Sequence, residues 1–125
     1  MIHLDTNFLI MSLGPGTAQQ TLLHQWLATN VGIGMDAIAW SEFHCGPLTP
    51  TQQQAAETFI TSIEPFFATD SIRAAALFNS SGRRRGTLND CMIAAICLRT
   101  GASLATSNAA DFQAFVSAGL QLIVV

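Results

Sequence analysis

Short apolar runs alternate with longer helical stretches along this chain of 125 residues. Strands that alternate with helices in this way form α/β domains with a mainly parallel sheet. We therefore expect an α/β fold built around such a sheet. The sequence predicts strands over residues 2–4, 31–35, 65–68, 102–106 and 122–125.

Helical segments separate these strands, and several carry start signals. Thr17 and Thr49 are each followed three residues later by glutamine, which is the pattern of a capping box. We expect helices over residues 36–45 and 111–117. Further helices are expected around Phe8 to Ile10, after Thr17, and from Pro50. Two more are expected later in the chain. One follows Thr69 and Asp70 and runs through Ile72, Ala75 and Ala76, and the other begins at Asn89 and Asp90 and ends at Gly101.

The composition limits the size and the location of the protein. Half of the residues are hydrophobic and 10% are charged, which is enough apolar material for one core, so we expect a single domain over residues 1–125. No apolar run approaches the ~18 residues of a membrane helix, and the N-terminal residues contain no basic leader. Three cysteines without a CxxC motif are typical of a reducing compartment. We therefore expect a cytoplasmic protein that does not enter a membrane.

Four of the eight acidic residues occupy informative positions. Asp5 ends the first predicted strand, Glu42 lies on the helix after the second, Asp90 opens the apolar helix, and Asp111 follows the fourth strand. Open parallel sheets bind ligands beyond the carboxyl ends of their strands, so these side chains can meet in one cleft. Carboxylates gathered there would repel one another unless a hard cation such as Mg²⁺ or Mn²⁺ neutralised them.

Each of these acids also has a simpler interpretation. Asp5 can cap the following helix, and Asp90 can complement a helix dipole. Glu42 can be a solvated helix residue, and Asp111 a turn residue. The spacing alone therefore makes a metal site plausible without proving one.

Four motifs resemble those of the PIN domains, in particular the VapC-type toxins of bacterial toxin–antitoxin pairs. The resemblance rests on the following residues, which lie in the family's order and span the chain: Met1 to Asn7, Trp40 to Phe43, Asn89 to Ala95, and Ala105 to Phe112. It implies a three-layer α/β/α sandwich and an endoribonuclease that depends on Mg²⁺, or on Mn²⁺.

By the same resemblance, Asp5, Glu42, Asp90 and Asp111 form a catalytic and metal-binding quartet. Asp5 and Asp90 would lie nearest the metal, Asp111 would bind it directly or through water, and Glu42 would orient or deprotonate the attacking water. The expected products carry a 5′-phosphate and a 3′-hydroxyl.

Uncharged polar residues flank these acids. They are Thr6, Asn7, Thr106 and Asn108, which can hold substrate or waters, or can simply close the strand ends with hydrogen bonds.

The net charge of −3 is unusual for a protein that binds RNA. Without the quartet, however, four acids face five arginines. Three of these arginines, Arg83, Arg84 and Arg85, precede Asp90 closely, and we expect them to contact RNA phosphates; a solvated loop is the alternative.

The apolar share also predicts an exposed apolar patch for self-association or partner binding. In the PIN toxins such a surface makes a homodimer and receives a VapB-type antitoxin.

A second function remains open, namely a PIN-like module without catalytic activity that acts only in binding or scaffolding. The aromatic residues Trp26, Trp40, Phe43, Phe59, Phe66 and Phe67 are expected mainly in the core.

Overall fold

The computed structural model describes all residues 1–125 and contains one five-stranded sheet. Every pairing in the sheet is parallel, and the strand order is β3-β2-β1-β4-β5. The strands are β1 (Ile2–Leu4), β2 (Ile33–Asp36), β3 (Ile63–Glu64), β4 (Ser103–Thr106) and β5 (Leu122–Val124). The expected α/β architecture with a mainly parallel sheet is confirmed.

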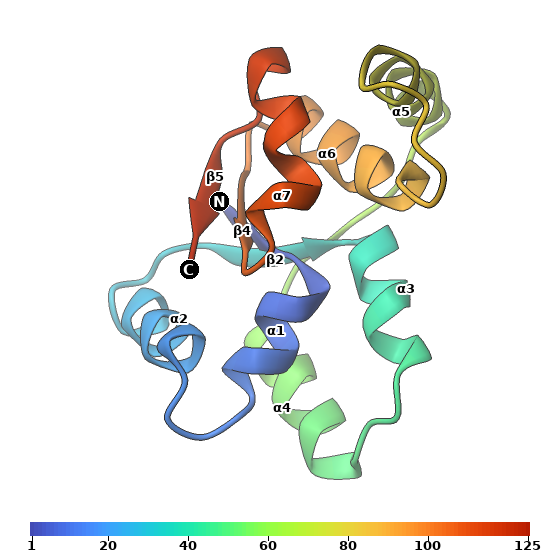
Figure 1. Cartoon of the computed structure of the whole chain (residues 1–125). Helices are drawn as coiled ribbons and strands as arrows, with labels where there is room; N and C mark the ends of the chain where they lie inside the picture. Colours follow the sequence, from blue (N-terminus) through green and yellow to red (C-terminus); the bar gives the residue numbers. More distant parts are fainter.

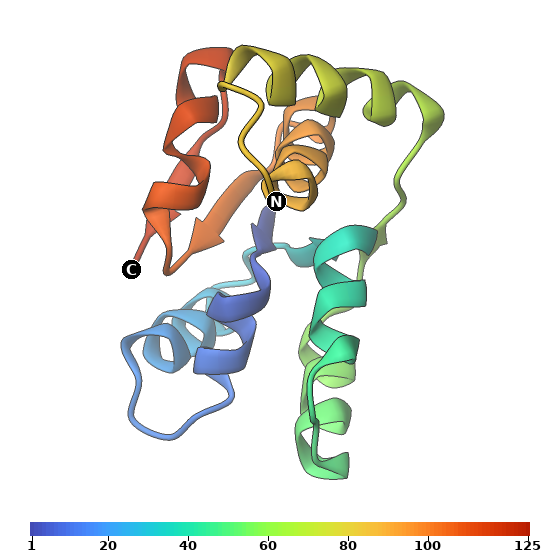
Figure 2. The ribbon, with the colours of Figure 1, turned by 45° about the vertical axis from the view of Figure 1, so that its right-hand side comes forward.

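Seven α-helices surround this sheet, and Figures 1 and 2 show α1, α2 and α4 on one side of it and α5 and α6 on the other. The helices are α1 (Thr6–Ser12), α2 (Ala18–Ala28), α3 (Ala37–Cys45), α4 (Pro50–Phe59), α5 (Ala68–Ser80), α6 (Leu88–Thr100) and α7 (Ala109–Phe112), which a 3₁₀ helix over Gln113–Ala118 extends. The arrangement is an α/β/α sandwich. None of these helices is long and apolar enough to cross a membrane.

Polar side chains start several helices, and two of these side chains are acidic. Asp5 caps α1 directly after β1, and Asp36, the last residue of β2, caps α3. Thr49 forms the complete capping box at α4 that the sequence predicts. At α2 only half of the capping box forms. The hydroxyl of Thr17 accepts from the N–H of Gln20, but the side chain of Gln20 accepts from the N–H of Gly16 and not from the N–H of Thr17.

The hydrophobic core lies between the sheet and both helical layers. Leu4 and Leu104 of the central strands are completely buried, as are Phe8 of α1 and Phe43 of α3. Helix α6 is the most enclosed helix, since six of its residues are buried, Cys91 and Cys97 among them. Its N-terminal turn, and therefore Asp90, is held against the sheet by this packing.

The third predicted strand is wrong. Strand β3 covers only Ile63–Glu64, and the chain then turns into α5. Pro65 cannot donate a ladder hydrogen bond. The N–H of Phe67 donates instead to Asp70 at 2.8 Å, so Asp70 lies within the first turn of α5 rather than preceding the helix.

Two further expectations near α5 and α7 need correction. The predicted helix through Ile72, Ala75 and Ala76 is present, but Ile72 is 73% exposed, and Ala74 and Leu77 are the residues of α5 that face the core. Phe67 is 48% exposed rather than part of the core. The predicted helix over 111–117 begins earlier, at Ala109, and changes to a 3₁₀ helix at Gln113.

Candidate active site

The centre of the site lies where three neighbouring strands end. In the register of the sheet, His3 of β1 pairs with Gly34 of β2, and Leu4 pairs with Ala105 of β4. Continuing each register to the carboxyl ends of these strands places Asp5 between Asp36 and Thr106. Adjacent strands lie about 4.8 Å apart, so these three side chains are neighbours.

Asp5 is almost completely buried, with 7% of its surface exposed, and both of its carboxylate oxygens accept hydrogen bonds. Oδ1 accepts from the N–H of Thr6 at 2.9 Å, and Oδ2 accepts from the hydroxyl of Thr106 at 3.0 Å. Burial raises the pKa of Asp5 and the charge of Asp111 adds to this, while the two hydrogen bonds oppose the rise. The side chain is thus fixed in position and destabilised in its charged form.

Glu42 lies on α3 and points one oxygen into the protein. Its Oε1 is buried and has no hydrogen-bond partner. Burial raises the pKa of Glu42, and the charges of Asp5 and Asp36 raise it further. A buried carboxylate oxygen without a donor is costly, so this atom is available to an incoming ligand.

Asp90 in the first turn of α6 completes the group. Its pKa rises to about 7, first because of burial and then because of the charges of Asp111, Asp5 and Glu42. Asp90 therefore lies within electrostatic range of the three other predicted acids. Asp90 accepts no hydrogen bond from any side chain, which distinguishes it from Asp5 and Asp111.

Asp111 is exposed at the rim of the group and is held by its neighbour in the same turn. The side-chain amide of Asn108 donates to Asp111 Oδ2 at 2.7 Å. The backbone N–H of Asn108 donates to the hydroxyl of Thr106 at 3.0 Å. A continuous series of hydrogen bonds therefore runs from Asp111 through Asn108 and Thr106 to Asp5.

The uncharged residues beside the acids divide into two groups. The polar groups of Thr6, Thr106 and Asn108 are already engaged within the site, and the Thr6 hydroxyl donates to the carbonyl of Ala39 at 3.1 Å. Asn7 is exposed and makes no side-chain hydrogen bond. Of the four, only Asn7 has a free side chain for substrate.

The acids do not form a ready set of metal ligands, because no three of the Asp, Glu, His or Cys side chains converge on one point. Their chemistry nevertheless fits a hard cation. They offer only oxygen donors, neighbouring carboxylates raise the pKa of Asp90 and of Glu42, and Glu42 Oε1 has no partner. A cation bound among these carboxylates would reduce the repulsion between them.

A family model decides the identity of the fold. The PIN domain model matches residues 2–116 of this chain. The chain belongs to the PIN domain family.

Solved structures with the same fold agree with this PIN domain assignment. VapBC2 from Rickettsia felis, bound to a DNA fragment from its promoter, matches with 21% identity and a TM-score of 0.77 over 100% of this chain and 99% of the other. FitAcB from Neisseria gonorrhoeae matches with 21% identity and a TM-score of 0.75 over 98% and 96%. A toxin–antitoxin complex from Klebsiella pneumoniae matches with 22% identity and a TM-score of 0.73 over 99% and 97%. No match was found among curated protein sequences.

The three arginines of the loop before α6 differ in the contacts that they make. Arg83 adopts a φ of +54°, donates to Asn79 at 2.5 Å, and lies 5.7 Å from the centre of the Phe78 ring. Arg84 and Arg85 are exposed and form no ion pair. Arg84 also lines a small crevice together with Asp111, so the loop reaches the rim of the acidic group.

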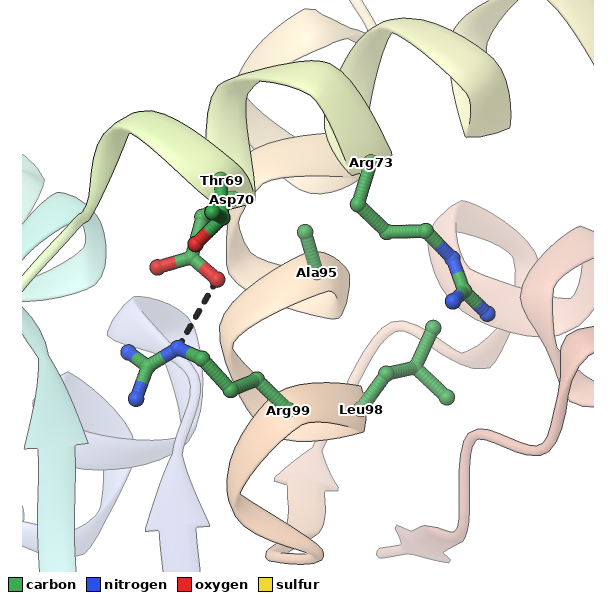
Figure 3. Close-up of a pocket in the computed structure, with 6 residues that line it drawn as sticks. All are labelled: Thr69, Asp70, Arg73, Ala95, Leu98 and Arg99. Carbon is green, nitrogen blue, oxygen red and sulfur yellow. Dashed lines mark hydrogen bonds and ion pairs between the residues drawn. The ribbon is translucent and has the colours of Figure 1, made fainter.

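The largest pocket of this PIN domain lies elsewhere, between α5 and α6, with a volume of about 320 Å³. Figure 3 shows Arg99 bonded to Asp70 on one side of it and Arg73 extending along the other side, beyond Ala95. None of the four acids lines this pocket. The candidate active site is therefore identified by its group of carboxylates and is not the largest pocket of the protein.

One acidic residue escaped the sequence-based prediction. Asp36 is completely buried beside Asp5, although its place after the second strand matches that of Asp5 after the first. This parallel was the signal that could have revealed it.

Proposed function

We propose that this PIN domain, over residues 1–125, is a metal-dependent endoribonuclease and the toxin of a VapBC-type toxin–antitoxin pair in the cytoplasm. One observation carries the nuclease proposal. Four carboxylates from four separate segments gather at the carboxyl edge of the sheet, where burial and the charges of Asp111, Asp5 and Glu42 raise the pKa of Asp90 to about 7. Such a group stays ionised at neutral pH most readily with a divalent cation among its members.

The four acids would have different roles in phosphodiester hydrolysis. Asp5 and Asp90 would hold Mg²⁺ or Mn²⁺, and Asp111 at the rim would bind it directly or through water. When bound, the ion polarises the phosphodiester and lowers the pKa of water. Glu42, whose Oε1 has no partner, would orient and deprotonate the attacking water. Attack by water leaves a 5′-phosphate and a 3′-hydroxyl.

The remaining polar residues would either bind the RNA substrate or hold the acids and the basic loop in position. Arg84 and Arg85 would contact RNA phosphates beside the acids, because both are unpaired and Arg84 lines a crevice with Asp111. Asn7 would reach the substrate as well. Thr6, Thr106 and Asn108 would position the acids, and the anchored Arg83 would shape the loop.

An apolar groove supports the proposed partners. It has a volume of about 220 Å³ between α1 and the α3–α4 connection, where Ile10, Leu13, Phe43, Pro47 and Leu48 line it. No charged residue lines this groove. It suits an apolar segment of a VapB-type antitoxin, and toxin–antitoxin complexes share the fold. Exposed apolar residues elsewhere, among them Ile72 and Phe67, support a homodimer. The mass of the particle in sedimentation tests this proposal.

The deciding experiment is cleavage of transfer, ribosomal and messenger RNA by the purified chain, freed of any antitoxin. Reactions contain Mg²⁺, Mn²⁺ or a chelator and are repeated with Asp5→Asn and with Glu57→Gln, an exposed acid on α4. We expect cleavage that needs metal, is lost in Asp5→Asn and persists in Glu57→Gln. Cleavage that survives both the chelator and Asp5→Asn contradicts the proposal.

The alternative is a PIN-like module that only binds other molecules. A folded chain that neither cleaves RNA nor binds Mn²⁺ would establish this alternative.

A further inference from the structure

Asp36 is a fifth carboxylate in the acidic centre, and its surroundings differ from those of the quartet. It is 0% exposed at the end of β2. Its Oδ1 accepts a hydrogen bond from the N–H of Ala39 at 2.8 Å, which caps α3. Its Oδ2 is buried without a partner, and the only other such side-chain atom in the chain is Glu42 Oε1, on the helix that Asp36 caps.

The capped residue, Ala39, connects Asp36 to Asp5. The N–H of Ala39 donates to Asp36, and its carbonyl accepts from the hydroxyl of Thr6 at 3.1 Å. The N–H of Thr6 in turn donates to Asp5 at 2.9 Å. The first turn of α3 is therefore held on one side by Asp36 and on the other by the segment that carries Asp5.

Helix α3 also carries Glu42, six residues after Asp36. A helix is stiff over this length, so a shift of its first turn moves Glu42 relative to Asp5. Residues that hold catalytic groups within a fraction of an ångström contribute strongly to rate, although they never touch substrate. The cap at α4 uses Thr49 in the same role, but that helix carries none of the acids.

We propose that Asp36 is a positioning residue of the acidic centre, which fixes the first turn of α3 and thereby sets Glu42 relative to Asp5. The inference rests on the proposed nuclease function and adds a residue to it. It requires only that Asp36 accept the hydrogen bond of Ala39.

The test compares Asp36→Ala, which removes the cap, with Asp36→Asn, which keeps an acceptor oxygen of the same shape. Thr49→Ala is the matched control, because it removes a cap of similar strength from α4, away from the acids. RNA cleavage kinetics, Mn²⁺ dissociation constants from calorimetry and thermal unfolding are measured for each variant. If Asp36→Ala does not fold, Asp36→Gly replaces it, since glycine is a tolerated N-cap residue.

We expect Asp36→Ala to lower kcat about tenfold or more, with little change in KM for RNA. Asp36→Asn should recover kcat to within about threefold of the wild type, because its side chain can still cap the helix. Thr49→Ala should lower thermal stability and leave kcat unchanged.

Two results would overturn the proposal. One is a loss of kcat in Asp36→Ala that is no larger than the loss in Thr49→Ala. The other is an Asp36→Asn variant as inactive as Asp36→Ala, because the charge and not the cap would then matter.

The Mn²⁺ measurements separate this inference from the proposed function. If the wild type binds Mn²⁺ and cleaves no RNA, the proposed function fails, and the dissociation constants decide the role of Asp36. Because the first turn of α3 also contacts the segment that carries Asp5 through Thr6, we then expect Asp36→Ala to bind Mn²⁺ several-fold more weakly and Asp36→Asn to recover the affinity. Equal affinities in all variants would overturn the role of Asp36 in that case.

Discussion

Thr106 shows how one uncharged residue organises two acidic segments. Its side chain is completely buried, donates to Asp5 Oδ2 and accepts from the N–H of Asn108. Asn108 then holds Asp111. The threonine thus fixes Asp5 directly and Asp111 through one intermediate, and its one O–H donor is not free for substrate.

We expect Thr106→Val, which keeps the shape and removes the hydroxyl, to lower the free energy of unfolding by about 1–2 kcal/mol. The N–H of Asn108 and Asp5 Oδ2 each lose a partner, so RNA cleavage should fall as well. Urea denaturation measures the first effect. Thr58→Val on the exposed face of α4 is the control, with an expected change within about 0.5 kcal/mol. Equal effects of the two substitutions would show that the buried hydroxyl has no special role.

Much of the site could be predicted at this scale, because Asp5, Glu42 and Asp90 each stand at a recognisable point in the alternation of strands and helices. The bond between Thr106 and Asp5 could not, since it joins residues 101 positions apart in the sequence. It depends on the sheet order, which places β4 beside β1. Local spacing does not encode that order.

At the scale of elements, Arg99 fastens the end of α6 to the connection between β3 and α5. Its guanidinium donates to Asp70, Glu64 and the carbonyl of Pro65 at 2.8, 2.8 and 2.9 Å. It also lies 4.4 Å from the centre of the Phe67 ring. These contacts explain why the predicted strand over 65–68 is wrong, because an arginine far along the chain binds this segment, which lies outside the sheet.

We expect Arg99→Ala to lower the free energy of unfolding by about 1–2 kcal/mol, a range reduced because the arginine is partly exposed to solvent. Arg73→Ala removes an arginine from the same pocket, but one that forms no ion pair, and should have little effect. Thermal or urea unfolding of both variants is the measurement. A loss in Arg73→Ala as large as in Arg99→Ala would argue against the role of Arg99.

The loop before α6 should separate into a structural arginine and two that bind RNA. We expect Arg84→Gln and Arg85→Gln each to weaken RNA binding and to reduce the slope of log affinity against log salt by about one. Arg83→Gln should change this slope less, because Arg83 is engaged by Asn79 and Phe78. Binding is measured at several salt concentrations with the Asp5→Asn variant, to prevent cleavage. Unchanged slopes in Arg84→Gln and Arg85→Gln would support a merely solvated loop.

At the scale of the whole molecule, the acidic group opposes folding at neutral pH. The pKa of Asp90 rises from its ordinary value of 3.8 to about 7, mainly through burial. The folded chain therefore binds more protons than the unfolded chain between these values. The contribution of Asp90 to stability consequently falls as the pH rises from about 4 to 7.

We expect Asp90→Asn to be more stable than the wild type at pH 8, by about 1–2 kcal/mol, a range reduced because Asp90 is partly exposed to solvent, and to differ little from it at pH 4. The comparison isolates Asp90 from other groups that titrate, such as His3, whose pKa burial lowers. Chemical unfolding of both proteins at each pH, in the presence of chelator, measures the difference. A gain that does not grow with pH would contradict the raised pKa of Asp90.

The fold as a whole was more predictable than its surfaces. The alternating pattern predicted the parallel sheet and most of the helices, because burial on both faces of a strand leaves a strong apolar signal. It did not predict that Ile72 would be 73% exposed, since the pattern shows that a helix face is apolar and not what covers it.

The most direct test of the acidic centre is a calorimetric titration of the metal-free chain with Mn²⁺ at pH 7.5. We expect saturable binding that is lost in Asp5→Asn and Asp90→Asn and unchanged in Glu57→Gln. Binding that is absent from the wild type, or equally strong in all four proteins, would contradict a metal centre built from these carboxylates.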